Sequence, residues 1–371
     1  MQIVSFSGFV MLSGIFRRFP FAGRLVKVNN HEDNTVSFYI DCNDILGAKF
    51  VHAKAESVSV SDFLQPNGAM FLNLLGFSSH FGYNHLVADA GSMWKFLQDW
   101  SKICLNGQQE NLQPLVLKGW FLDMIDFPVH IPLSEIETAK AATRGETTLT
   151  KERVFHFTKR NISYLKDKAN GEIGSSDLKI SSLQVVLGQL WQSIARHGGL
   201  NREEEMSCMF PADFRKRLNP PLVKECFGNV AYTVVATATV GELQGHGLGL
   251  AALRISEILR SSTNENYRSH EEDWVRNGNI PRIEVHSKMC DNSLFVSSSP
   301  WFEVYDNDFG WGKPIAVRAG PANGIGGKLI VFRGIEEGSI DVHAILTLSL
   351  WSDVLVNLLD DVASMENVTT T

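Results

Sequence analysis

The chain has 371 residues, of which 44% are hydrophobic and 20% are charged. This composition is typical of a soluble globular protein and excludes the disordered and fibrous classes. The length predicts two domains rather than one. The formal net charge is −7 and the lysines and arginines are scattered, so we expect no nucleic-acid partner.

The five cysteines lie far apart and form no C-x-x-C pair: Cys42, Cys104, Cys208, Cys226 and Cys290. This pattern argues against a zinc site and against a disulfide framework, and it fits the reducing cytoplasm. We therefore expect a cytoplasmic protein without a bound metal.

The first residues, Ile3–Phe16, are apolar, and two arginines follow them. A signal peptide carries its positive charge before the apolar run, and this run is too short to span a bilayer. We expect a buried helix or strand here, and no membrane partner.

Two elements are expected before the middle of the first domain. Phe19–Leu25 contains Pro20 and Gly23 and predicts a turn between apolar segments. Val36–Asp41 alternates between apolar and polar residues, as a half-buried strand does.

The most informative stretch is a short strand that ends at His85, followed by a helix that begins near Asp89. Asp89 can cap the free N–H groups of the helix, or it can pair with a distant cation. An imidazole at such a corner can face a cleft and take a proton from a hydroxyl or an amine. A single buried stripe is expected along the helix, formed by Met93, Phe96, Leu97 and Trp100.

From Gly107 onward the composition changes to Gln, Pro and Thr, which predicts the connection between two domains. We place the domains at residues 1–130 and 153–371, with a crossover linker at 131–152. The strands expected in the second domain are Arg153–Thr158, Met206–Asp213, Tyr232–Val240, Lys328–Phe332 and Ser339–Val342. The expected helices are Asn161–Ala169, one opened by Ser181 and Ser182, Leu248–Leu259 and Leu350–Val362.

Two further features concern charge and turns. Arg215 and Arg217 follow the acid Asp213; they form either a solvated surface or the cation that holds Asp89. Asp308–Gly312, with the sequence DFGWG, combines an acid, two aromatic residues and two glycines, which predicts a tight turn whose rings pack into a neighbouring domain.

The ordered pair of His85-x-x-x-Asp89 and Asp308–Gly312 resembles the plant BAHD acyltransferases. Phe19–Leu25 is similar to the F-x-P-L-A-G-R-L turn of that family, and the resemblance runs from about Phe16 to the C-terminus. Further matches are Asp213–Arg217, Pro220-Pro221 and Phe227–Asn229.

The resemblance implies an α/β chloramphenicol-acetyltransferase-like architecture. In it, two domains each contain a mixed sheet with helices, and the active-site channel runs between them. It implies that an acyl-CoA is the donor co-substrate, that no cofactor is permanently bound, and that the acceptor is a small-molecule alcohol or amine. His85 is then the general base for direct attack on the thioester, without an acyl-enzyme. A monomer in plant specialised metabolism is the expectation.

The resemblance also assigns roles around His85. Asp89 is expected to be structural and bound to Arg217 or Arg215. Trp301 stands where members with acidic acceptors often place an arginine, which argues against a shikimate-like acceptor and puts Trp301 in the acceptor pocket. Ser181 and Ser182 are expected to face the CoA channel. The interface is expected to be supported by Asp308, Gly310, Trp311 and Gly312, with Trp311 also near the oxyanion.

The chain departs from the family pattern in its N-terminal part. Most of the strand region before Phe16 is expected to be missing, together with a strand pair between Phe63 and Phe81. Two alternatives therefore stay open beside the transferase. One is a shortened or spliced, catalytically degenerate member with a binding role or no activity; the other is a relative that performs elimination in the same cleft.

Overall fold

The computed structural model describes residues 15, 19–43, 85, 87–107, 115–116, 129–142, 149–175, 178–278, 292–310, 312–318 and 326–348. Within these residues the chain forms two β-sheets, one of three strands and one of six. The predicted strand before His85, the predicted helix Leu350–Val362 and Trp311 lie outside the described residues.

The first sheet has the order β1-β2-β3, and both of its pairings are antiparallel. Its strands are β1 (Arg24–Asn30), β2 (Thr35–Asp41) and β3 (Ile131–Pro132). The predicted turn at Phe19–Leu25 contains a short 3-10 helix, Pro20–Ala22. Strand β1 was not expected, because it is exposed on most of its length and lacks the alternation that marks a half-buried strand.

The second sheet is mixed and has the order β4-β9-β8-β7-β5-β6. Strand β7 pairs in parallel with both β5 and β8, and the other pairings are antiparallel. Its strands are β4 (Thr150–Phe157), β5 (Glu205–Asp213), β6 (Ala231–Thr239), β7 (Ser293–Ser298), β8 (Lys328–Arg333) and β9 (Ile340–Thr347). The five strands predicted for this domain are confirmed, and β8 pairs with β9 as expected.

The described residues also form seven α-helices. They are α4 (Ala90–Asn106), α5 (Leu133–Ala142), α6 (Lys159–Ile173), α7 (Ser182–His197), α8 (Val240–Gly245), α9 (Leu248–Ser261) and α10 (Asn264–Asn277). A further 3-10 helix spans Val304–Asp306. The residues predicted as a crossover linker, 131–152, contain β3, α5 and the start of β4.

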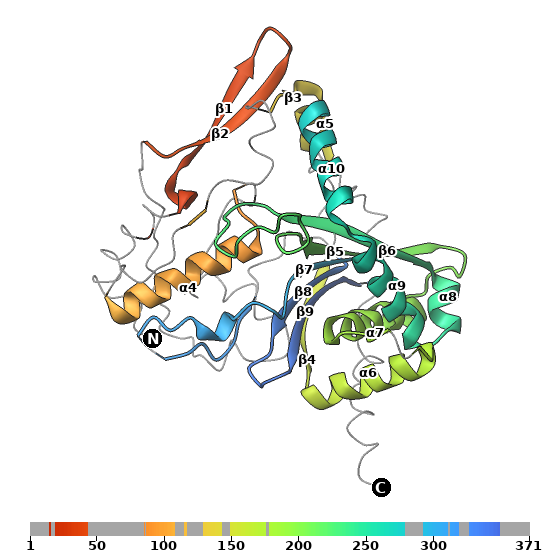
Figure 1. Ribbon diagram of the computed structural model, residues 1–371. Coiled ribbons are helices and arrows are strands. Elements are labelled where there is room, and N and C mark those ends of the chain that lie inside the picture. The colour runs from red at the N-terminus through yellow and green to blue at the C-terminus, as the bar shows by residue number, and fades with distance from the viewer. Residues whose placement is uncertain are drawn as a thin grey trace.

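The two faces of the second sheet serve different partners. Leu329 and Val331 point into the main core, which they share with α6, α7 and α9. Their neighbours Ile330 and Phe332 instead pack against Trp94 of α4. Because successive residues of a strand point to opposite faces, α4 must lie on the face away from those three helices. Figure 1 shows this arrangement, with α4 apart from α6, α7 and α9.

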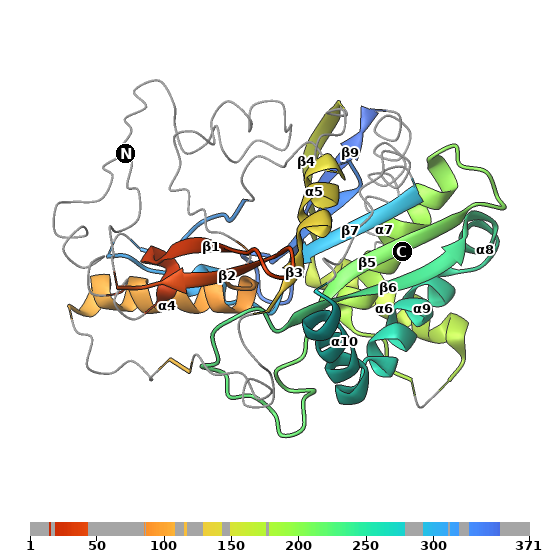
Figure 2. The ribbon, with the colours of Figure 1, turned by 90° about the horizontal axis from the view of Figure 1, so that it is seen from above.

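Helix α4 buries a wider part of its surface than the single stripe that the sequence predicts. Phe96 is fully buried, whereas the predicted Met93, Leu97 and Trp100 are only half-buried, and Trp94 is more buried than they are. The helix contacts two apolar clusters, one around Phe96 and one around Trp94. Seen from above, α4 lies on the same side of the molecule as β1 and β2, away from α8 and α9 (Figure 2).

Candidate active site

The candidate site begins at the first turn of α4. Asp89 is the N-cap residue, with an extended backbone (φ −83°, ψ 177°), and its Oδ1 accepts a hydrogen bond from the Ser92 N–H at 2.9 Å. An aspartate in this position satisfies one of the free N–H groups of the helix. Asp89 is only 3% exposed, so its charge requires a partner.

That partner is Arg215, from the segment that follows β5. One guanidinium nitrogen lies 2.8 Å from Asp89 Oδ2, and the other donates to Oδ1 at 3.1 Å. The Val230 N–H also donates to Oδ2, at 3.0 Å. Asp89 therefore caps its helix and pairs with the cation at the same time, although the sequence presented these roles as alternatives.

Arg215 is itself buried, at 7% exposure, and its remaining donors are used. It donates to the carbonyl oxygens of Cys226 and Gly228, each at 3.2 Å, and to the Asp213 carboxylate at 3.1 Å. Burial alone lowers the pKa of the guanidinium. The hydrogen bonds and charges of Asp89 and Asp213 outweigh burial, so the net pKa is raised. The cation is thus fixed in its charged form.

Arg217, the other arginine suggested by the sequence, points elsewhere. Its guanidinium donates to the carbonyl oxygens of Leu259 and Ser262, at 2.8 and 3.2 Å. It ties α9 to the segment after β5. Between the two candidates, Arg215 is the one that the structure places at Asp89.

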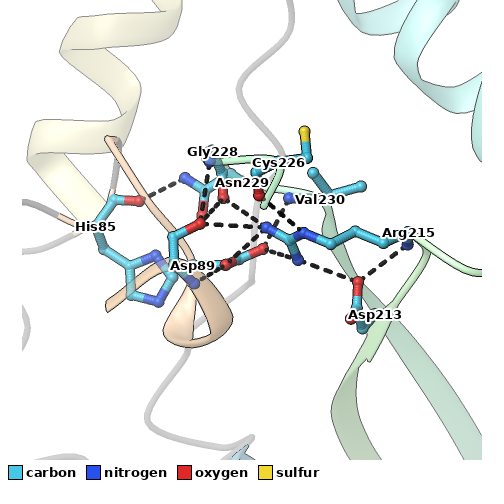
Figure 3. A network of polar contacts seen from close by, with 9 residues as sticks. His85, Asp89, Asp213, Arg215, Cys226, Gly228, Asn229 and Val230 are labelled. Carbon is cyan, nitrogen blue, oxygen red and sulfur yellow. Dashed lines mark hydrogen bonds and ion pairs between the residues drawn. The ribbon is translucent and has the colours of Figure 1, made fainter. Parts of the chain in front are cut away.

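His85 lies at the edge of this network and is exposed. The Asn229 side chain donates Nδ2–H to the His85 carbonyl oxygen at 2.5 Å. In Figure 3, His85 lies at one end of the network and Asp213 at the other, with the Asp89–Arg215 pair between them. The buried Asp89–Arg215 pair therefore lies beside a histidine that is exposed to solvent.

The loop around Gly228 joins the two halves of the site. The Ser92 hydroxyl donates to the Gly228 carbonyl oxygen and accepts from the Gly228 N–H, both at 3.0 Å. Gly228 has φ +146°, a conformation that favours glycine. Sequence reasoning noted Phe227–Asn229 as a family match but assigned no role to Gly228, Asn229 or Ser92.

Aromatic rings hold this loop against the first domain. Phe227 packs edge-on against Phe19 and Phe21, with ring centroids 5.6 and 5.2 Å apart. Phe19 in turn packs edge-on against Phe96 of α4, at 5.3 Å. One apolar cluster therefore joins the turn at Phe19–Leu25, helix α4 and the Gly228 loop, next to the site.

Asp308–Gly312 forms the tight turn that the sequence predicts. Asp308 Oδ1 accepts from the Gly310 and Gly312 N–H groups, at 2.8 and 3.0 Å, and both glycines have φ above +90°. The Phe309 ring packs edge-on against Trp100 of α4, with centroids 4.9 Å apart. The turn thus contacts the same helix whose first turn carries Asp89.

The remaining predicted residues lie apart from the network. Ser181 is the N-cap of α7, in a reciprocal capping box with Gln184, and Ser182 is the first residue of that helix. Trp301 is 74% exposed. Among the described residues there is no group of three or more metal-binding side chains, and no helix there is long and apolar enough to cross a membrane.

The chain and its fold are similar to those of known proteins. A family model described as the transferase family matches residues 76–352. An uncharacterized acetyltransferase of Arabidopsis thaliana is 57% identical over 376 residues, covering 94% of this chain and 84% of that protein. The BAHD acyltransferase DCR of the same plant is 27% identical, covering 90% of this chain and 75% of that protein.

Solved structures agree on the fold. A crystal structure of TRI101 from F. sporotrichioides has a TM-score of 0.69 at 17% identity, covering 96% of this chain and 91% of that chain. The predicted fold class, a two-domain chloramphenicol-acetyltransferase-like α/β architecture, is confirmed. The predicted shortening of the N-terminal part stays a prediction. The chain belongs to the transferase family matched here, that of the BAHD acyltransferases, and it is an acyltransferase.

Proposed function

We propose that the chain transfers an acyl group from acyl-CoA to a small-molecule alcohol or amine, with His85 as the general base, in plant specialised metabolism. The observation that carries this proposal is the position of His85. Its main chain is held by Asn229 beside the buried Asp89–Arg215 pair, while the residue itself is exposed to solvent. A general base needs a fixed position and must be reachable by the acceptor, and both features support the proposal.

The chemistry follows from an imidazole acting on a hydroxyl or an amine. A ring nitrogen of His85 takes the acceptor's proton as the acceptor oxygen or nitrogen attacks the thioester carbonyl carbon. The tetrahedral intermediate then collapses, the carbon–sulfur bond breaks, and CoA leaves as a thiolate that receives the proton from His85. No acyl-enzyme is required, so no cysteine or serine nucleophile is invoked.

The names of similar proteins support the donor and the acceptor class. TRI101 was crystallised with coenzyme A and T-2, a small-molecule ligand. Similar proteins include a hydroxycinnamoyltransferase from Narcissus and an anthranilate N-benzoyltransferase from Dianthus. The acceptor atom in this proposal is the oxygen of an alcohol or the nitrogen of an amine.

Other site residues keep the roles that the resemblance gives them, as parts of this proposal. Ser181 and Ser182 lie at the start of α7 and are assigned to the CoA channel, and the exposed Trp301 is assigned to the acceptor pocket. Asp308, Gly310, Trp311 and Gly312 are assigned to support of the domain interface. We further propose a cytoplasmic monomer without a permanently bound cofactor.

If the chain were a degenerate member with only a binding role, we would expect the hydrogen bonds and ion pairs around His85 to be lost. Asp89 and Arg215 instead keep a paired set of hydrogen bonds, and both are buried. These contacts support transfer rather than the alternative.

Calorimetry with coenzyme A and acetyl-CoA tests the donor, and release of free thiol from acetyl-CoA with a panel of alcohols and amines tests transfer. We expect coenzyme A to bind and at least one acceptor to accelerate thiol release. Absence of binding by a cooperatively folded protein would refute the proposal.

A further inference from the structure

Asn229 makes the contact that links the main chain at His85 to the second domain. Its side-chain Nδ2–H donates to the His85 carbonyl oxygen at 2.5 Å, across 144 positions of sequence (Figure 3). Asn229 itself is exposed. An exposed hydrogen bond of this kind adds little to the free energy of unfolding, because water can replace either partner. We therefore look for its effect on the geometry of the site rather than on stability.

The neighbours of Asn229 are held on both sides by the first turn of α4. Before it, the Gly228 carbonyl oxygen accepts from the Asp89 N–H at 3.2 Å and from the Ser92 hydroxyl at 3.0 Å. After it, the buried Val230 donates its N–H to the Asp89 carboxylate at 3.0 Å. The residues on both sides of Asn229 are therefore bonded to Asp89, so Asn229 cannot move without breaking the hydrogen bonds between Asp89 and its neighbours.

His85 stands four positions before Asp89, so one cluster of contacts fixes the base from two directions. The contacts of Asp89 hold the chain at a point four residues after His85. The Asn229 amide, in turn, fixes the direction of the His85 carbonyl group. The direction of a peptide group sets the backbone dihedral angles, and these determine which side-chain rotamers are allowed. A water molecule in place of the amide would satisfy the carbonyl oxygen without fixing its direction.

We propose that Asn229 is a positioning residue for the general base: its side-chain amide orients the backbone of His85 and thereby the imidazole. This inference rests on the proposed function of His85. Asn229 does not touch the substrate in this account; it acts through His85.

The test compares Asn229→Ala and Asn229→Asp with a matched control, Asn266→Ala. Asn266 also donates its Nδ2–H to a main-chain carbonyl oxygen, that of Ser261 at 2.9 Å, but on α10. With acetyl-CoA and an active acceptor, Asn229→Ala should lower kcat by about ten- to a hundredfold, because small misplacements of a base have effects of this size. The KM for acetyl-CoA and the thermal midpoint should stay near wild type, and Asn266→Ala should change none of these values.

The aspartate variant adds a readout that a merely structural role would not move. Aspartate has the size of asparagine but donates a hydrogen bond only when protonated. The ratio of its rate to the wild-type rate should therefore rise as the pH falls. A ratio that is flat with pH, together with a wild-type kcat for Asn229→Ala, would overturn the assignment.

A double-mutant cycle separates this inference from the function on which it rests. In a His85→Ala background, Asn229→Ala should cause no further loss of rate, because its effect passes through the imidazole. If His85→Ala leaves the rate unchanged, the proposed function is wrong. If His85→Ala removes the activity while Asn229→Ala alone is silent, only the role of Asn229 is wrong.

A measurement without substrate keeps the inference testable if no acceptor is found. The side-chain resonances of His85 can be assigned in nitrogen-15 NMR spectra as those that vanish in His85→Ala. Asn229→Ala should shift or broaden them, and Asn266→Ala should not. Unchanged His85 resonances in Asn229→Ala would contradict the proposal.

Discussion

The Asp89 carboxylate and the Arg215 guanidinium, 126 positions apart in the sequence, form a buried two-point contact at the start of α4. Through it the helix after His85 is joined to the segment after β5. The same guanidinium donates to the carbonyl oxygen of Gly228, so the pair also fixes the loop that carries Asn229. The buried ion pair thus connects the first turn of α4 with the loop that carries Asn229.

Removal of one partner of this pair should be strongly destabilising. Asp89→Ala leaves the Arg215 charge buried without its main counterion, and it also removes the cap of α4. The expected loss in the free energy of unfolding is about 3–5 kcal/mol, as for other broken buried ion pairs. Urea denaturation measures it.

Arg217→Ala is the control for that loss. Arg217 bonds to main-chain carbonyl oxygens near the surface, so its removal should cost about 1 kcal/mol. Equal losses for Asp89→Ala and Arg217→Ala would contradict the central place that we give to the Asp89–Arg215 pair.

Gly228→Ala tests the backbone of the loop rather than its packing. A Cβ at this position would meet no atom within 4 Å, so any penalty comes from the φ of +146°. We expect a loss of about 1–3 kcal/mol in the free energy of unfolding. Gly245→Ala, at the end of α8 and equally uncrowded, should instead be neutral or stabilising by up to about 1 kcal/mol. A silent Gly228→Ala would show that the loop adapts.

The contact between Phe309 and Trp100 should couple the Asp308–Gly312 turn to α4. In a cycle of Phe309→Ala, Trp100→Ala and the double variant, we expect a coupling energy of about 0.5–1.5 kcal/mol, the range for edge-on aromatic pairs. Thermal or urea unfolding supplies the three differences. A coupling energy of zero would mean that the turn supports the fold without help from this ring pair.

Glu271 on α10 should make stability depend on pH. Burial raises the pKa of its carboxyl to about 7, well above the value of an unfolded glutamate. The folded state therefore holds the proton more tightly, and the free energy of unfolding should fall as the pH rises from about 4.3 to about 7. Glu271→Gln should remove this fall, measured by urea denaturation across that range, whereas Glu272→Gln, at an exposed position, should retain it.

Local chemistry made much of this molecule predictable. The start of α4 at Asp89 follows from capping, and five of the six strands of the second sheet, all except β7, follow from their β-branched or alternating residues. Strand β1 escaped prediction because its exposure leaves no alternating pattern. These successes and failures concern signals within a few residues of each other.

The polar contacts of the site depend on signals that a sequence does not carry. Arg215 and Arg217 lie only two positions apart in the chain, and the turn after Phe214 decides which of them reaches Asp89. The acceptor for Asn229 is a main-chain carbonyl oxygen, which every residue possesses. The resemblance to the family drew attention to Phe227–Asn229, but only the structure shows which atoms Asn229 contacts.

The most direct test of the account is the turnover number of His85→Ala, measured as thiol release from acetyl-CoA with an active acceptor. Calorimetry on the same preparation shows whether coenzyme A still binds. His246→Ala, a substitution of another exposed histidine at the end of α8, is the matched control. We expect His85→Ala to lower kcat by about a hundredfold or more with coenzyme A binding retained, the size of a lost general base, and His246→Ala to behave as wild type. A wild-type kcat for His85→Ala would contradict the mechanism.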